Sequence, residues 1–211
     1  MGRKRPARPI TRTSDVLDIQ DYLRYKNCRD YVLFLVGVTT GYRAGDLVTL
    51  KVRDIKEALR RKEFTIYEGK KMKTKKIREK NRKPRTVELI PELAKILKEY
   101  IKDKKDYEYM FKSRKGVNKP IGIQAVTNAI KEAANYFGLY DITAHSMRKT
   151  YAYKIYIESD RDIVVVKELL GHSSIEETKR YIGLDREKYH QYSKSLRDFV
   201  RWYFLFLTMN V

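Results

Sequence analysis

The sequence contains a single cysteine and no apolar run long enough to cross a membrane. One cysteine cannot form an intramolecular disulfide, which fits a reducing compartment, and it offers no cysteine-based metal cluster. The basic N-terminus, MGRKRPARPITRTSD, lacks the apolar centre of a secretory signal. We therefore expect a cytoplasmic protein with no membrane association, in which Cys28 lies among apolar neighbours in the core.

Acidic residues are scarce relative to basic ones. The chain has 27 Asp and Glu against 47 Lys and Arg, which gives a net charge of +20. Such an excess repels itself unless a polyanion neutralises it, so nucleic acid is the leading partner. A membrane surface is the alternative, but 17 tyrosines spread along the chain and the lack of a lone basic amphipathic helix favour a nucleic-acid-binding protein. Charge alone does not separate DNA from RNA.

The chain has no internal repeat and no interior linker rich in Gly, Pro or Ser, which predicts one domain. Residues 1–13 are expected to form a basic flexible tail. Asp15 is the predicted N-cap of a helix that runs to about Tyr25. A second helix is apolar nearly all round over residues 31–38 and ends at Gly41, and a short third helix covers residues 43–50.

Two strands are predicted over residues 63–69 and 86–90, joined by a long basic connection as a β-hairpin. Proline at position 91 suits the start of the next helix. The fold class is therefore mostly α with a small antiparallel β-sheet (α+β). The further helices are expected over residues 91–101, 123–136, 144–158, 162–170, 175–181 and 186–206.

The connection between the strands, KKMKTKKIREKNRKPR, holds ten Lys or Arg and one Glu. Presented on a hairpin, this density of charge can contact several phosphates. The alternative is a solvated, mobile charge run, which is equally common for such a segment taken alone. Its position between two good strands favours a loop that reaches DNA. The residues predicted to bind DNA are Lys71, Lys75, Lys76, Arg78, Lys80, Arg82, Lys83 and Arg85.

Four separated motifs carry a more specific signal: TGYRAGDL with Arg43, AHSMRKT with His145 and Arg148, LLGHSS with His172, and KRYIG with Tyr181. Each is weak alone, because a lone histidine is more often a capping or core residue than a catalyst. Together, in this order and with nine residues from His172 to Tyr181, they resemble the motifs of the tyrosine recombinase (phage integrase) family. The resemblance covers residues 15–192, nearly the whole chain, and implies the catalytic-domain fold of that family.

The resemblance implies a site-specific recombinase or integrase that cleaves and rejoins DNA through a 3′-phosphotyrosine on Tyr181. A phenol is easier to deprotonate than an aliphatic alcohol and forms a covalent intermediate that divides one hard step into two. Arg43 and Arg148 would clamp the negative charge of the transition state, with a hydrogen bond from His172. His145 would act in proton transfer near the nucleophile. Neither a metal, nor ATP, nor any other cofactor is then required.

The family also uses a hairpin lysine to protonate the leaving 5′-oxygen, and three lysines of this sequence match in different ways. Lys73 begins KTKKIR, which is similar to the family pattern K-T-x-K-x-R, and ranks first. Lys70 follows the first strand at the expected distance and ranks second. Lys80 matches only when residues are counted back from TVEL, and ranks third.

Local signals support the motifs. Asp46 lies one turn after Arg43 and matches the family's acidic residue there, where a carboxylate can orient the guanidinium; the alternative is an ordinary surface acid. Gly171 is the predicted C-cap of one helix, and Ser173 and Ser174 are predicted N-cap residues of the next.

The ends of the chain carry further expectations. Residues 14–192 form the predicted catalytic domain, and the apolar segment 193–211 either folds back on its own domain or passes to a neighbouring subunit. Family members assemble as tetramers on paired sites in double-stranded DNA, so we expect a homo-oligomer there. The family usually has a separate N-terminal DNA-clamping domain, so this chain is either truncated or a single-domain recombinase whose basic tail supplies part of the grip.

Two other functions compete with recombination. A type IB topoisomerase uses the same constellation, but the LGHSS box favours a recombinase. A DNA-binding protein that kept the fold and lost cleavage is the second alternative, which the intact set of Arg, His and Tyr residues disfavours. Integration of a mobile element is favoured over excision or chromosome-dimer resolution.

Overall fold

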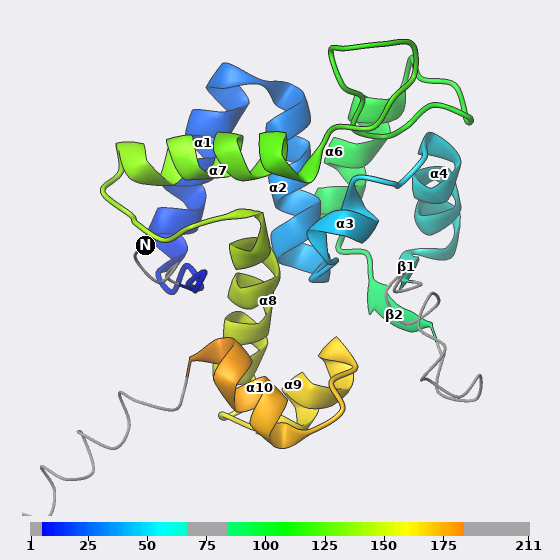
Figure 1. Cartoon of the computed structure of the whole chain (residues 1–211). Helices are drawn as coiled ribbons and strands as arrows, with labels where there is room; N and C mark the ends of the chain where they lie inside the picture. The colour runs from blue at the N-terminus through cyan, green and yellow to red at the C-terminus, as the bar shows by residue number, and fades with distance from the viewer. Residues whose placement is uncertain (1–5, 67–83, 184–211) are drawn as a thin grey trace, which may run out of the picture.

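The computed structural model describes residues 6–66 and 84–183, and these are mostly helical with one two-stranded antiparallel sheet (Figure 1). This confirms the predicted fold class. The elements are α1 (Thr13–Lys26), α2 (Cys28–Thr40), α3 (Ala44–Leu47), α4 (Val52–Arg61), β1 (Glu63–Ile66), β2 (Arg85–Glu88), α6 (Pro91–Ile101), α7 (Ile123–Tyr136), α8 (Ala144–Glu158), α9 (Ile163–Leu170) and α10 (Ile175–Ile182).

Helix α2 lies at the centre of the main core, in contact with α1, α6, α7 and α8 (Figure 1). Its residues 32–37 are all buried, as the apolar composition on every face predicts. Gly37 allows α8 to approach closely, because a Cβ at this position would lie 3.1 Å from Cβ of Met147. The helix that leads into the first motif is therefore packed directly against the helix that carries the second.

The predicted β-hairpin is present, but its second strand ends at Glu88 and not at residue 90, and residues 67–69 of the predicted first strand lie outside the described residues. β1 and β2 are antiparallel, with Glu63 paired to Glu88 and Ile66 to Arg85. Leu89 follows β2 as a buried residue whose N–H donates to the carbonyl of Lys62 at 2.9 Å. Ile90 is the N-cap of α6. Pro91 then occupies the first helical position, where its missing N–H costs no hydrogen bond.

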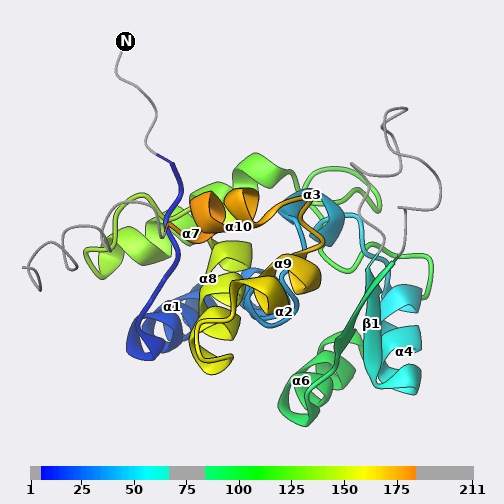
Figure 2. The ribbon, with the colours of Figure 1, turned by 90° about the horizontal axis from the view of Figure 1, so that it is seen from below.

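A second, smaller apolar cluster joins α8 to α9 and α10. Its buried members are Tyr151, Ala152, Tyr156, Val166, Leu170 and Ile182. In Figure 1, α9 and α10 lie at the lower end of α8, and in Figure 2, which is seen from below, they lie in front of it. Because α8 contributes to both clusters, it connects the HxxR motif to the segment that carries LLGHSS and KRYIG.

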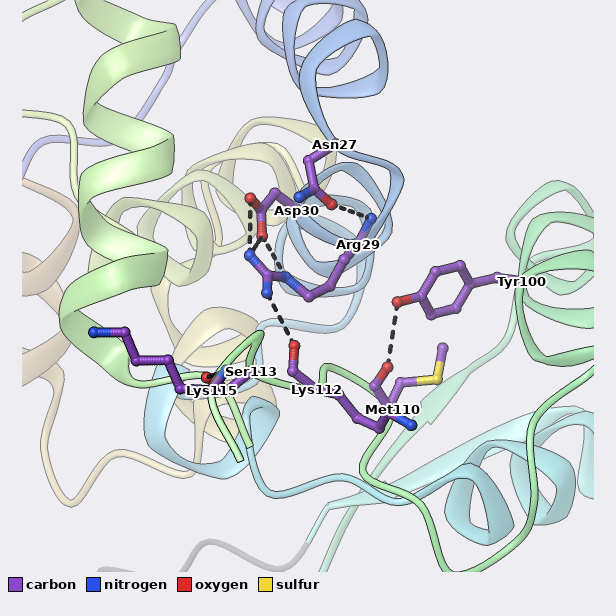
Figure 3. Close-up of polar contacts among 8 residues, drawn as sticks. All are labelled: Asn27, Arg29, Asp30, Tyr100, Met110, Lys112, Ser113 and Lys115. Atoms are coloured by element: carbon purple, nitrogen blue, oxygen red, sulfur yellow. Dashed lines mark hydrogen bonds and ion pairs between the residues drawn. The ribbon is translucent and has the colours of Figure 1, made fainter. Parts of the chain in front are cut away.

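The segment between α6 and α7 is held by polar contacts from the start of α2 and from α6 (Figure 3). The Arg29 guanidinium pairs with the Asp30 carboxylate and donates to the carbonyl of Lys112 at 2.9 Å. The Tyr100 hydroxyl donates to the carbonyl of Met110 at 3.3 Å. These contacts hold the connection between α6 and α7, which has no helix or strand of its own among the described residues, against the core.

Three expectations at the start of the chain are corrected. Arg12, and not Asp15, occupies the N-cap of α1, and Asp15 is buried in the first turn, where it accepts from Arg12 at 2.8 and 3.0 Å. Cys28 is exposed instead of buried, because it is the first residue of α2 and the buried run begins only at residue 32. Ile10, placed in the predicted tail, is buried, and its N–H donates to Oγ1 of Thr150 at 2.9 Å.

The region between the first motif and the hairpin also differs. The predicted helix over residues 43–50 is the shorter α3, and α4 was not predicted. Its buried side chains, Val52, Ile55 and Ala58, recur at helical spacing, which is the signal that identifies it. The predicted helix over residues 186–206 lies outside the described residues. No helix in the described part of the chain has both the length and the apolarity to cross a membrane.

Candidate active site

The site begins at the N-terminus of α8. Oγ1 of Thr143 caps this helix by accepting from the backbone N–H of His145 at 3.2 Å, and the hydroxyl of Ser146 accepts from the N–H of Thr143 at 3.0 Å. These two bonds fix the first turn. His145 and Arg148 are three residues apart and therefore share one face of the helix.

Arg148 is 1% exposed and joins three segments that are distant in sequence. Nη1 donates to the carbonyl of Gly41 and Nη2 to the carbonyl of Leu170, each at 2.8 Å. Both acceptors lie at helix C-termini, because Gly41 and Gly171 are the left-handed C-caps of α2 and α9. A cation is favoured at such ends by the unsatisfied carbonyls and the helix dipole. One guanidinium thus ties α8 to the turns that precede Arg43 and His172.

Arg85 lies at the same turn. It was predicted to bind DNA from the hairpin connection, but it is the first residue of β2. Nη2 donates to the carbonyls of Thr40 and Gly41, at 2.9 and 3.2 Å, and the guanidinium lies 5.9 Å from the ring centre of Tyr151. Arg85 therefore supports the turn that carries Arg43, a role that sequence reasoning missed.

Arg43 occupies the N-cap position of α3 and is half-buried. Asp46 lies in the first turn of the same helix, also half-buried, and its N–H donates to the carbonyl of Arg43 at 2.9 Å. This places the predicted buttress on the same short turn as the arginine. An orienting contact from its carboxylate stays a prediction.

His172 is buried, and its Nδ1 atom lies 3.0 Å from Oγ1 of Thr178. The same hydroxyl lies 3.1 Å from the carbonyl oxygen of Ser174. These contacts hold the imidazole ring in the turn before α10, beside Tyr181.

The turn before α10 matches its prediction in part. Oγ of Ser174 is the N-cap and accepts from the N–H of Glu177 at 3.1 Å. The N–H and hydroxyl of Ser173 both donate to the Glu177 carboxylate, at 3.0 and 2.9 Å. Burial acts to raise the pKa of Glu177, but the bonds from Ser173 and the positive charges of His172 and Arg43 outweigh it and lower that pKa.

Tyr181 lies between the two histidines. Its ring centre is 5.1 Å from that of His145 and 5.0 Å from that of His172, both at edge-to-face angles. The ammonium of Lys149 is 5.2 Å from the centre of the same ring. Sequence reasoning did not single out Lys149, although it directly follows Arg148 in AHSMRKT.

The structure thus brings together five predicted residues from the start of α3, from α8, from the turn after α9 and from α10: Arg43, His145, Arg148, His172 and Tyr181. Arginines suit binding of an anion, and a phenol beside two imidazoles suits nucleophilic attack with proton transfer. Within residues 6–66 and 84–183, no group of three His, Cys, Asp or Glu side chains has metal-binding spacing. The remaining predicted residues lie outside the described residues: Lys70, Lys71, Lys73, Lys75, Lys76, Arg78, Lys80, Arg82 and Lys83.

Comparisons with known proteins agree with these motifs. The profile of the phage integrase family matches residues 10–188. A probable integrase/recombinase, YoeC of Bacillus subtilis (strain 168), is 34% identical over 179 residues, which are 85% of this chain and 91% of that protein. A tyrosine recombinase of Pseudothermotoga lettingae is 28% identical over 187 residues, 86% of this chain and 59% of that protein.

Solved structures show the same fold. The XerA recombinase superposes with a TM-score of 0.63 at 21% identity, over 94% of this chain and 68% of that one. A lambda integrase dimer bound to a COC′ core site gives 0.61 at 18% identity, over 89% and 51%. The family profile covers most of the chain, and the motifs meet in one site. The chain therefore belongs to the phage integrase family and has the catalytic-domain fold of the tyrosine recombinases.

Proposed function

We propose that this chain cleaves and rejoins DNA strands at specific sites through a 3′-phosphotyrosine on Tyr181. The observation that carries the proposal is the position of the Tyr181 ring between His145 and His172. Arg148 ties the turns that hold Arg43 and His172 to this same place. The net charge of +20 supports double-stranded DNA as the partner.

In the proposed cleavage step, the Tyr181 oxygen attacks the scissile phosphorus and the bond from phosphorus to the 5′-oxygen breaks. The phenol proton leaves to a base, for which His145 is the proposed acceptor, and the 5′-oxygen takes a proton from a hairpin lysine. Lys73 is first among the lysine candidates, ahead of Lys70 and Lys80. Attack by a 5′-hydroxyl on the phosphotyrosine reverses the step and rejoins the strand.

Negative charge increases on the non-bridging oxygens as the phosphorus becomes five-coordinate. The guanidinium groups of Arg43 and Arg148 oppose that charge, and Nε2 of His172 can donate to it when the imidazole is protonated on both nitrogens. Charge stabilisation by these three side chains makes a metal ion unnecessary. The bond energy stays in the phosphotyrosine, so the proposed reaction uses no ATP.

The proposal extends to assembly. Exchange between two DNA sites needs four active tyrosines, so we propose a tetramer on paired sites. The apolar segment 193–211, which lies outside the described residues, is proposed to contact a neighbouring subunit. A chain ending at residue 192 should bind a single site normally but assemble weakly on paired sites; unfolding of this shortened chain as a monomer would show that the segment belongs to its own core.

The test of cleavage uses a pool of nicked suicide duplexes with a randomised central sequence, in which the cut fragment diffuses away and traps the adduct. The wild-type chain should give a denaturation-resistant protein–DNA adduct, and sequencing of the trapped DNA identifies the site. Tyr181→Phe should give no adduct while its DNA affinity stays within a few-fold. Tyr140→Phe, which changes an exposed tyrosine, is the matched control and should react normally.

Two further arms of this experiment separate the alternatives. The adduct should form equally in EDTA, and a strict need for a divalent metal in the cleavage step would contradict the mechanism. With the trapped site in hand, two labelled duplexes should exchange strands. Relaxation of a supercoiled plasmid without exchange, or an adduct that survives Tyr181→Phe, would refute the proposal.

A further inference from the structure

Lys149 follows Arg148 on α8 and is 9% exposed. Its Nζ atom lies over the ring of Tyr181, 5.2 Å from the ring centre. A lysine side chain seldom occupies a buried position unless a negative group offsets the loss of its hydration. The residues around Lys149 therefore indicate which negative group offsets the burial of its ammonium.

In the described part of the chain, no carboxylate forms an ion pair with Lys149. Burial accordingly lowers the pKa of its ammonium, and no charged neighbour contributes appreciably to that shift. The phenolate that Tyr181 becomes during nucleophilic attack is a negative group that forms next to this ammonium. A cation over an aromatic ring is attracted even before ionisation and more strongly afterwards.

We propose that Lys149 is a positioning residue for the nucleophile, whose ammonium holds the Tyr181 ring and stabilises the phenolate as the proton leaves. The inference rests on the proposed role of Tyr181. It assigns to Lys149 the attacking side of the reaction, whereas the hairpin lysine acts on the leaving oxygen.

Other polar and charged side chains near the ring make contacts of their own. His145 on α8 and His172 before α10 meet the ring edge to face. The Arg148 guanidinium binds carbonyls contributed by α9 and by the C-cap of α2, and Glu177 of α10 accepts from Ser173. Lys149 lies over the face of the same ring, 5.2 Å from its centre.

The decisive measurement is an ionisation titration of position 181 that does not depend on activity. 3-Fluorotyrosine, whose phenol ionises at a lower pH than that of tyrosine, is incorporated at this single position, and its fluorine resonance is followed against pH. Lys149→Met should raise the midpoint by about one pH unit, because an adjacent cation contributes energy of that order. Lys149→Arg keeps the charge and should stay near the wild-type midpoint.

Lys154→Met is the matched control. This lysine is on the same helix, but it is exposed and pairs with Glu158 at 2.6 Å. Its loss should leave the fluorine titration unchanged. An equal midpoint in the Lys149→Met and Lys154→Met proteins would overturn the proposal.

Single-turnover adduct formation at saturating DNA gives the functional readout. Lys149→Met should slow the step about tenfold at neutral pH, and the deficit should shrink as the pH rises and the phenol ionises without help. Lys149→Arg should restore most of the rate. A deficit that is the same at every pH, or that appears only as weaker DNA binding, would overturn the proposal.

The two proposals fail in different ways. A wild-type chain that forms no adduct would refute the cleavage function, whereas the fluorine titration would still measure the interaction of Lys149 with Tyr181. A normal adduct with an unshifted titration would refute the role of Lys149 alone.

Discussion

Replacement of Gly41 by alanine tests how the first motif is built. Gly41 has φ 63°, and its carbonyl accepts from both Arg148 and Arg85. An added Cβ would lie 2.5 Å from Cδ1 of Tyr151, which is a buried side chain of α8. The substitution therefore combines backbone strain with a steric clash at the turn that carries the arginine network.

The two effects are separable because Gly138 provides a control. It has φ 72°, and a Cβ there would meet nothing within 4 Å. Gly138→Ala should therefore show the strain alone, about 1 kcal/mol. Gly41→Ala adds overpacking against Tyr151, about 1–3 kcal/mol, so its total loss should be about 2–4 kcal/mol.

Urea unfolding followed by circular dichroism measures the loss of stability for both variants. Adduct formation is then assayed at low temperature, where both remain folded. Gly41→Ala should lose cleavage beyond its loss of folded protein, because the displaced carbonyl no longer holds Arg148. Equal stability losses for the two variants, or normal cleavage by folded Gly41→Ala, would refute this account of the turn.

Three other changes test separate contacts. Thr178→Val removes the hydroxyl that contacts Nδ1 of His172 and should slow adduct formation about tenfold, as single-turnover rates will show. Thr150→Val leaves the Ile10 N–H without its acceptor, so urea unfolding should show a loss of about 1–3 kcal/mol; an unchanged midpoint would mean that the contact is dispensable. Hydrogen bonds from Arg60 and Arg61 lower the pKa of Glu57 from 4.5 to about 2. The ionised carboxylate therefore contributes to the free energy of unfolding above pH 4.5, and this contribution is lost as the pH falls through 2. Glu57→Gln should therefore lose less stability than the wild type between these pH values.

Helix boundaries were predictable where the caps are local. The bounds of α8 match the prediction, with Thr143 as its N-cap, and α9 begins after Asp162, whose side chain accepts from the N–H of Val164 at 2.7 Å. The bounds of α7 also match, although no side chain caps it. Gly171 ends α9 with φ 63°. These signals act within a few residues, so they can be read without knowledge of the tertiary structure.

Other features depend on partners that are distant in sequence. Cys28 follows Asn27, the cap of α2, so its exposure depends on how two helices meet and not on its type. Helix α4 escaped prediction because charged residues predominate in VRDIKEALRR and its buried stripe has only three members. Arg85 and Lys149 look like any basic residue until the fold places them against Tyr151 and Tyr181.

The choice of arginine at position 148 illustrates why motif spacing and fold are inseparable here. Its two terminal nitrogens bind carbonyls that lie 107 and 22 residues away in sequence. A guanidinium presents its donors as a planar fork and can span two fixed acceptors, whereas a lysine ammonium is a single point of charge. Lysine at this position would keep the charge but would leave one buried helix end without its donor. The HxxR spacing therefore places an arginine where it closes the ends of α2 and α9, so the proposed site assembles only when these helices have packed.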